Sequence, residues 1–456
     1  MSSFLKIVLI LLFALTACGK NIDMLEEPNT NKHNINSISL DTKTFDSHIT
    51  PVDLRHSMWI YDITQLRSHI LETHPHFVVR EYERAFGHEK NTDILFAMDA
   101  ILLETIQNIP NLTDSEIMIE LRRTLTKLND NHSVFFDFND RLFEKMYPVA
   151  FKFFSDGIYL YLSAEDYSKH LNSKLVYINH IPIDTIMEYF LNHFSTQNRY
   201  HARSSSGADF TSFIRSHKGL VALGVKSEDD ESVIFTLVDN NGSRFDLKLY
   251  DLHSSDSLNF TDAQINDYPL FLSKNGNWIE FDDYHGILYI RASTFALASG
   301  WPIMQLELNM HLNENANNIN TIIFDARYNR GGHAPIGFIN LLVDNAPHDS
   351  LFVFMNESSL SAALIAAVLL QENNAILIGQ PSGQNMYFFI ASNDYTIRLK
   401  YSGYKFAIAS QRANVSHLTY IAEDGILRPN ILIEYTIDDW INSRDPLLEY
   451  VVTKKR

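Results

Sequence analysis

The sequence predicts an α/β fold with α+β elements: a helical N-terminal unit, a β-rich middle region and a C-terminal α/β domain built on a mostly parallel sheet. Three observations predict it. Apolar residues recur every three or four positions up to about residue 128, short extended runs follow to about 275, and apolar strands then alternate with helical segments. Strands that alternate with helices imply crossover connections and a parallel sheet, which binds ligands at the carboxyl ends of its strands.

Length and composition set the broad class. The chain has 456 residues, 45% of them hydrophobic, which is enough for two or three globular domains and too apolar for a disordered protein. Lys and Arg number 37 against 55 Asp and Glu, a formal net charge of −18, so nucleic acid is not expected as a partner. Cys18 is the single cysteine, which excludes an intramolecular disulfide and any CxxC metal or redox motif.

The N-terminus has the features of a signal peptide at residues 1–17. Lys6 precedes an apolar run that is shorter than the roughly 20 residues needed to span a bilayer. The segment Leu-Thr-Ala-Cys resembles a bacterial lipobox, which implies that cleavage leaves Cys18 as a lipid-modified N-terminus. Residues 18–50 are polar and lack apolar periodicity, so they predict a flexible tether. We expect a lipid-anchored protein of the bacterial envelope, facing the periplasm or the outside, and Gly19 after the cysteine favours the outer membrane.

The N-terminal domain is predicted to be helical and to cover residues 51–147. Apolar spacing predicts three helices, over 59–70, 95–106 and 117–128. Pro75 and Pro110 should end the first two, because proline lacks the N–H group and clashes with the preceding turn. Thr113 and Glu116 form the pattern of a capping box at the start of the third.

The rest of the chain divides into a β-rich middle region, 148–275, and an α/β domain, 276–456. The middle region includes a hairpin that turns at residues 240–242. The C-terminal domain is predicted to alternate strands at 278–281, 286–293, 321–325, 351–355 and 375–379 with helices over 304–312, 336–342 and 361–370. A hairpin-rich stretch, which includes 386–391 and 395–401, then leads to a C-terminal helix.

Ser361 is the first candidate for chemistry, because it lies in the run NESSLSAA just after a predicted buried strand and begins a helix. A helix N-terminus presents unpaired N–H groups and the positive end of the helix dipole, and both can stabilise an oxyanion. The alternative is that Ser361 and its neighbours Ser358 and Ser359 only cap the helix.

The loop Asp325–His333 and His132 are the other two candidates. Two adjacent glycines, Gly331 and Gly332, allow close approach of the loop backbone to a ligand. Arg327 and Asn329 can brace the loop. The alternative is that this segment is an ordinary flexible turn. The loop lacks GxGxxG and GxxxxGK[ST], so nucleotide binding is not expected. His132 follows the third helix, and histidine, with a pKa of about 6.5, is the usual base for a serine hydroxyl.

Taken together, these segments resemble the tricorn and carboxyl-terminal processing (tail-specific) protease family of serine peptidases. The matching pieces are the D-x-R-x-N-x-G-G loop, the serine segment NESSLSAA, the strand end ILIGQPSGQ, the segment L-x-D-x-H-S around His132, which is typical of the tricorn-like branch, and the tail EDGILRPN. The resemblance extends from about Trp59 to Val452. It implies a C-terminal sheet of the ClpP/crotonase-like type.

The resemblance also implies roles for individual residues. The implied set is Ser361 as nucleophile, His132 as general base, Glu423 as the residue that orients the imidazole, and an oxyanion hole formed by the N–H groups of Ala362 and of Gly331 or Gly332. Asp130 is the alternative orienting residue. No metal or organic cofactor is expected, because no HExxH motif or ligand set is present.

Two departures from the family pattern leave a second function open. Gln384 stands where carboxyl-terminal processing proteases have their catalytic lysine, so a Ser–Lys dyad is not expected, and His180 replaces a glycine, so a PDZ-like module is degenerate at best. The first hypothesis is a lipid-anchored serine peptidase that hydrolyses peptide bonds in extended or unfolded polypeptides. The alternative is an inactive peptidase-fold module that binds a peptide, a hydrophobic ligand or an envelope protein.

Overall fold

The computed structural model describes residues 51–454 except 85–88, 196, 205–208, 254–259, 263–268, 297–299, 334, 348, 387–388, 391–394 and 413–423. The predicted signal peptide and tether, with Cys18, lie outside the described residues, and so does Glu423. Within the described ranges, no helix combines the length and apolar character that crossing a membrane requires.

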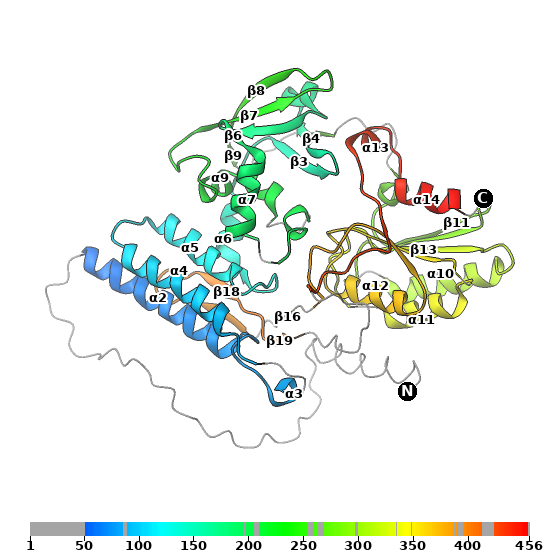
Figure 1. Ribbon diagram of the computed structural model, residues 1–456, viewed down its shortest axis with the longest axis horizontal. Helices are drawn as coiled ribbons and strands as arrows, with labels where there is room; N and C mark the ends of the chain where they lie inside the picture. The colour runs from blue at the N-terminus through cyan, green and yellow to red at the C-terminus, as the bar shows by residue number, and fades with distance from the viewer. Residues whose placement is uncertain are drawn as a thin grey trace.

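The N-terminal lobe is built from the three predicted helices, which are confirmed. They are α2 (Pro51–Thr73), α4 (Thr92–Asn108) and α5 (Asp114–Thr126), with the short α3 (Glu81–Arg84) between the first two (Figure 1). The capping box of α5 is confirmed as well: the Thr113 hydroxyl accepts from the Glu116 N–H, and the Glu116 carboxylate accepts from the Thr113 N–H at 2.7 Å. Both ends of this exchange satisfy N–H groups that the helix itself leaves unpaired.

The middle region forms an antiparallel sheet in the order β10-β4-β5-β7-β8, to which β3 and β6 add at β4 and β5. Its elements are β3 (Val149–Phe154), β4 (Gly157–Ala164), β5 (Lys174–Ile178), β6 (Ile181–Pro182), α7 (Ile183–His193), α8 (Phe210–Arg215), α9 (His217–Ala222), β7 (Ser232–Val238), β8 (Arg244–Tyr250) and β10 (Phe260–Asp262). The turn between β5 and β6 places Asn179 at φ 46° and His180 at φ 65°. Positive φ at both central residues explains why glycine suits this position better than histidine.

One pairing joins distant parts of the chain. β1 (Val134–Phe135) pairs with β18 (Lys405–Ala407), which in turn pairs with β17 (Thr396–Arg398). The neighbouring Leu399 and Ile408 are buried in the same core as α2, α4, α5 and the middle sheet. This segment, which the sequence analysis places in the C-terminal domain, therefore packs in the N-terminal core. The alternation of apolar residues predicts that a strand has a buried face, but it does not identify the sheet that the strand joins.

The C-terminal domain contains a six-stranded sheet in the order β11-β12-β13-β14-β15-β20. The strands are β11 (Trp278–Asp282), β12 (Ile287–Arg291), β13 (Thr321–Asp325), β14 (Leu351–Met355), β15 (Ile376–Gly379) and β20 (Ile431–Leu432). Only the β11–β12 pair is antiparallel, so the predicted α/β class with a mostly parallel sheet is confirmed. Its alternating strands and helices produce the crossover connections that the sequence predicts.

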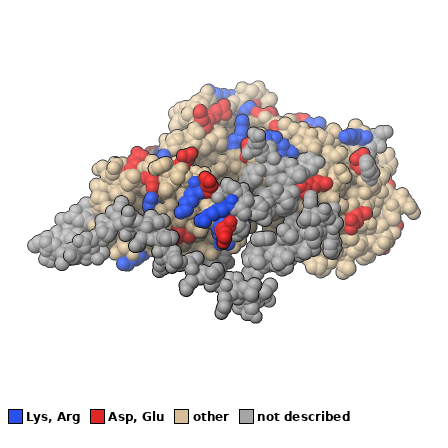
Figure 2. Space-filling model, turned by 60° about the horizontal axis from the view of Figure 1, so that its bottom comes forward, with Lys and Arg blue, Asp and Glu red and all other residues tan. Residues whose placement is uncertain are grey.

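Helices cover both faces of this sheet. α10 (Trp301–Glu314), α11 (Ile336–Asn345) and α12 (Ala362–Glu372) pack on one face, against side chains such as Phe324 and Val353. α14 (Pro446–Lys454) packs on the other face (Figure 1). Residues from the loops that follow β13, β14 and β15 line cavities together with residues of the N-terminal lobe and of the middle region. On the surface shown in Figure 2, acidic and basic side chains are interspersed.

Candidate active site

Ser361 occupies a strained turn between β14 and α12. Its backbone has φ 52° and ψ −123°, a conformation that costs a non-glycine residue on the order of 1–3 kcal/mol. The Ser361 N–H donates to the side-chain Oε1 of Gln384 in a very short hydrogen bond. Gly331 packs directly beneath the turn, since a Cβ at that position would lie 2.7 Å from the Ser361 Cβ. The sequence therefore requires glycine at 331 for this strand-to-helix turn to form.

The loop after β13 is braced as predicted, by Asn329 and Arg327. Asn329 donates from Nδ2 to the Ala292 carbonyl at 2.8 Å, and its own carbonyl accepts from the Leu360 N–H at 2.8 Å. Asn329 thus ties the loop both to the end of β12 and to the residue before Ser361.

Arg327 anchors the base of the same loop. Its guanidinium is 2% exposed and binds Asp325 at 2.6 Å and Asp445 at 2.8 Å. A planar guanidinium can pair with two carboxylates at once, which fixes the loop against the start of α14.

His132 is held by a turn that follows α5 and is organised around the buried carboxylate of Asp130. Asp130 accepts from the N–H groups of His132 at 2.9 Å and Ser133 at 2.8 Å, and from the Ser133 hydroxyl at 2.6 Å. The Nε2 of His74 lies 3.6 Å from its Oδ2. Burial raises the pKa of Asp130. The imidazoles of His74 and His132 and the Ser133 hydroxyl outweigh this effect and lower the pKa to about 2. Asp130 is therefore ionised and shapes the turn.

The environment of His132 favours the neutral imidazole. Burial lowers its pKa, and the charge of Asp130 opposes this only in part. Its Nδ1 lies 3.8 Å from Asp130 Oδ1 and 3.5 Å from the amide nitrogen of Gln384. A neutral imidazole near pH 7 can accept a proton, which is what a general base requires.

Ser361 and His132 line one cavity of about 230 Å³, which also includes Asn131, His201 and Gln384. The fold therefore brings together two predicted site residues that lie in different lobes. Gln384 joins them: its Oε1 accepts from the Ser361 N–H, and its Nε2 donates to Asn131 Oδ1 at 3.1 Å and faces the His132 ring. Sequence reasoning identified Gln384 only as a replacement for a lysine. Its position just past the carboxyl end of β15 was the signal that it could reach the site.

The predicted oxyanion donors differ in availability. The Gly331 N–H donates to Asn329 Oδ1 at 2.9 Å and is therefore engaged. The N–H groups of Gly332 and Ala362 have no acceptor within the described part of the chain. Of the two alternatives for the second donor, the geometry favours Gly332. Among the described residues, no cluster of three or more His, Cys, Asp or Glu side chains could hold a metal ion.

Comparison with known proteins identifies the fold. No protein-family model matches the sequence, and no curated protein matches it. Mature CPAF matches the structure with a TM-score of 0.56 and 12% identity, covering 88% of this chain and 97% of that chain. CPAF complexed with lactacystin gives 0.57 and 13%, covering 88% and 98%. The chain has the fold of CPAF.

A structure of the photosystem II D1 C-terminal processing protease also aligns, at a TM-score of 0.39 and 11% identity, covering 85% of this chain and 98% of that chain.

Proposed function

We propose that the protein is a serine peptidase that hydrolyses peptide bonds in extended or unfolded polypeptides. One observation carries the proposal: Ser361 lies in a strained turn at the N-terminus of α12 and shares a cavity with the neutral His132. A strained strand-to-helix turn exposes a serine hydroxyl beside helix N–H groups, an arrangement suited to a nucleophile. The fold shared with CPAF, a protein also seen in complex with lactacystin, supports it.

The mechanism follows from the positions of these groups. With Nδ1 of His132 facing Asp130 and Gln384, Nε2 removes the proton from Ser361 Oγ as that oxygen attacks a peptide carbonyl. The N–H groups of Ala362 and Gly332 donate to the oxyanion, and each should stabilise the transition state by roughly 2.7–4 kcal/mol. The imidazolium then protonates the leaving amine, and water hydrolyses the acyl-enzyme by the reverse sequence. Glu423 is the proposed orienting residue.

Hydrolysis of unfolded casein by the full chain in detergent tests this proposal. We expect Ser361→Ala and His132→Ala to abolish activity while leaving the fold intact. Ser115→Ala is the matched control, because Ser115 also lies in the first turn of a helix but does not line the cavity. Equal activity in wild type and Ser361→Ala would refute Ser361 as the nucleophile. Specific peptide binding without hydrolysis would favour the inactive binding module instead.

We further propose that Cys18 carries a lipid that anchors the enzyme to the bacterial envelope, with the outer membrane favoured. The lipobox-like segment before Cys18 supports this proposal. Labelling cells with radioactive palmitate should tag the wild-type protein and not Cys18→Ala, and sucrose-gradient separation of membranes would assign the membrane. Equal labelling of both proteins would contradict lipidation at this residue.

A further inference from the structure

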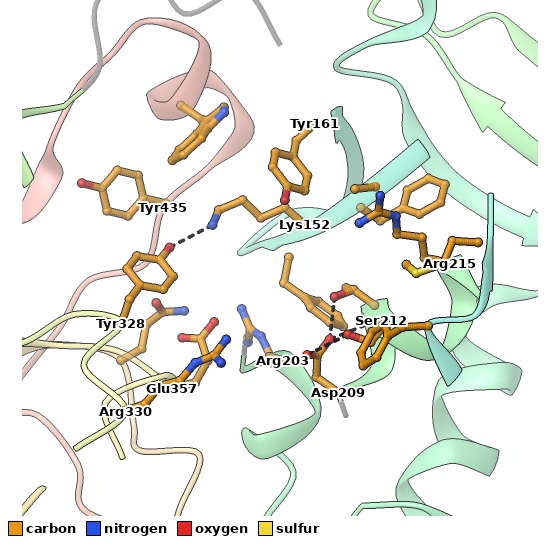
Figure 3. Close-up of a pocket in the computed structure, with 18 of the residues that line it drawn as sticks. Lys152, Tyr161, Arg203, Asp209, Ser212, Arg215, Tyr328, Arg330, Glu357 and Tyr435 are labelled. Atoms are coloured by element: carbon orange, nitrogen blue, oxygen red, sulfur yellow. Dashed lines mark hydrogen bonds between the residues drawn. The ribbon is translucent and has the colours of Figure 1, made fainter. Parts of the chain in front are cut away.

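A second cavity, of about 250 Å³, lies between the middle region and the C-terminal domain. Four cationic side chains line it: Lys152 from β3, Arg203 from the segment before α8, Arg215 from α8 and Arg330 from the loop after β13. Figure 3 shows them arranged around the cavity, with the Lys152 ammonium directed toward Tyr328. Such a concentration of positive charge is unexpected in a chain whose formal net charge is −18. We call this space the cationic cavity.

Three of the four cations have no carboxylate within ion-pair distance among the described residues. Lys152 donates to the Tyr328 hydroxyl at 2.9 Å and lies 4.9 Å from the ring of Trp440. Arg215 has a buried Nε without a hydrogen-bond acceptor, and Arg330 is exposed. The fourth, Arg203, binds a carboxylate at 3.1 Å through Nη2, but its Nε is also buried without an acceptor. Buried donors without acceptors are costly, so a bound acceptor would relieve these groups.

Two carboxylates line the same cavity, and they do not neutralise it. Asp209 accepts hydrogen bonds from Thr211 at 2.6 Å and from Ser212 at 3.1 Å, because it caps α8. Glu357 is 8% exposed, and its Oε2 has no donor. Burial raises the pKa of Glu357, and the charges of Arg203 and Lys152 oppose the rise. With the carboxylate of Glu434 that binds Arg203, four cations face three carboxylates, so an excess of positive charge remains in a partly desolvated space, where electrostatic attraction is strong.

The cationic cavity adjoins the candidate active site. Arg330 lines both cavities, and the next residue, Gly331, packs against Ser361. On the opposite wall, His201 lines the catalytic cavity while Arg203 lines the cationic one. An extended peptide advances about 3.3–3.6 Å per residue. A substrate held at Ser361 would therefore place a nearby side chain at this second cavity.

We propose that the cationic cavity is a substrate subsite that binds the side-chain carboxylate of an Asp or Glu close to the scissile bond. The inference rests on the proposed peptidase function. Guanidinium groups bind carboxylates in a fork geometry, and the rings of Tyr328 and Trp440 can pack against the aliphatic part of the side chain. A free C-terminal carboxylate is the other source of the same chemistry. An extended or unfolded polypeptide has one C-terminal carboxylate but Asp and Glu side chains along its length, so the side chain is the source that we assign.

Matched internally quenched peptides test the subsite with the full chain. In each pair, a single Glu at one position around the cleavage site is replaced by Gln, and every peptide is made with a free and an amidated C-terminus. At one position we expect kcat/KM for the Glu peptide to exceed that for the Gln peptide by roughly tenfold or more, as expected for a charge-assisted hydrogen bond. Amidation should leave that ratio unchanged. Equal rates for Glu and Gln, or dependence on the free C-terminus alone, would overturn the proposal.

Variants connect the preference to the cavity. Arg330→Gln and Arg215→Gln should each reduce the Glu-to-Gln ratio severalfold, whereas Arg215→Lys should retain part of it. Arg244→Gln is the control, because Arg244 lies on β8 outside the cavity, and it should leave the ratio unchanged. If neither arginine substitution changes the ratio, the carboxylate binds elsewhere and the proposal is wrong.

A binding measurement separates this proposal from the peptidase proposal. Fluorescence anisotropy with the full-length Ser361→Ala variant reports the dissociation constants of the Glu and Gln peptides without cleavage. If the variant binds the Glu peptide more tightly and the wild type hydrolyses neither peptide, the result would support the subsite and refute the peptidase. Equal binding by the variant together with cleavage by the wild type would refute the subsite and retain the peptidase.

Discussion

Gln384 offers the most direct test of how the site is held together. Its side chain is fully buried, and the two ends of its amide do different things: Oε1 accepts from the Ser361 N–H, and Nε2 donates to Asn131 Oδ1 at 3.1 Å beside the His132 ring. Gln384→Ala removes both ends. Gln384→Glu keeps an acceptor for Ser361 but loses the donor, so the pair of variants separates the two contributions.

The expected magnitudes follow from the partners left behind. In Gln384→Ala, the Ser361 N–H loses its acceptor, which costs about 1–3 kcal/mol when the group is shielded from water. Asn131 Oδ1 keeps only the longer hydrogen bond from Gln197 at 3.5 Å, and this weakening should add about 1 kcal/mol. We therefore expect a decrease of roughly 2–4 kcal/mol in the free energy of unfolding and a fall in kcat/KM of about 10- to 100-fold. Gln384→Glu should lose less stability, but its negative charge should raise the pKa of His132 and move the acid limb of kcat/KM to higher pH.

Urea unfolding and the pH dependence of kcat/KM on a casein-derived peptide measure these effects. Gln371→Ala is the control. Gln371 lies in α12 away from the cavity, and its side chain is another buried amide, 8% exposed, that donates to Asn430 Oδ1 at 3.3 Å. It should lower stability without changing the pH profile. Gln384→Lys should be inactive, since an ammonium group offers no acceptor to Ser361. Full activity and unchanged stability of Gln384→Ala would show that the amide does not organise the site.

Three further predictions concern single residues. Because burial lowers the pKa of His132, the acid limb of kcat/KM should have its midpoint below the ordinary histidine value of about 6.5; a midpoint above 6.5 would contradict a neutral base at this position. The pKa of Asp130 is lowered from 3.8 to about 2, so its stabilisation is present above pH 3.8 and is lost as the pH falls through 2. Asp130→Asn should therefore lower the free energy of unfolding, measured in urea, by about 2 kcal/mol at pH 7 and by almost nothing near pH 2. A decrease that does not depend on pH would show that the charge of the Asp130 carboxylate is not the source of this stabilisation. Finally, His180→Gly should raise the midpoint of thermal unfolding, by about 1 kcal/mol in stability, because φ is 65° at this position; a lower midpoint would show that the side chain matters more than the strain.

The parts of the fold that the sequence predicts well are those set by local patterns. The runs at 321–325 and 351–355 form strands over those same residues, because a strand buried on both faces is continuously apolar. The capping box of α5 depends on two residues three positions apart, Thr113 and Glu116. In the same way, a serine after a buried strand and before an apolar helix predicts the position of Ser361.

The parts that the sequence does not predict depend on contacts between distant segments. Nothing local in the segment around β18 indicates that it pairs with β1, because a period of two specifies a face and not a partner. The role of Gln384 likewise depends on where Asn131 and Ser361 lie in space. Glu423 and Cys18 lie outside the described residues, so their assignments remain predictions.

The pairing of Val134 with Ala407 has a consequence for how the protein folds. Phe135 stacks on Phe406 at a ring separation of 4.1 Å, inside a core whose other buried members come from residues 59–249 and from the segment around β18. At about 5–20 residues per second, a chain emerging N-terminus first has this core incomplete for roughly 15 to 60 s after Phe135 appears. Such nonlocal closure slows folding. The apolar cleft that awaits β18 is thus a natural binding surface for chaperones, and a fragment that ends at residue 275 should remain aggregation-prone.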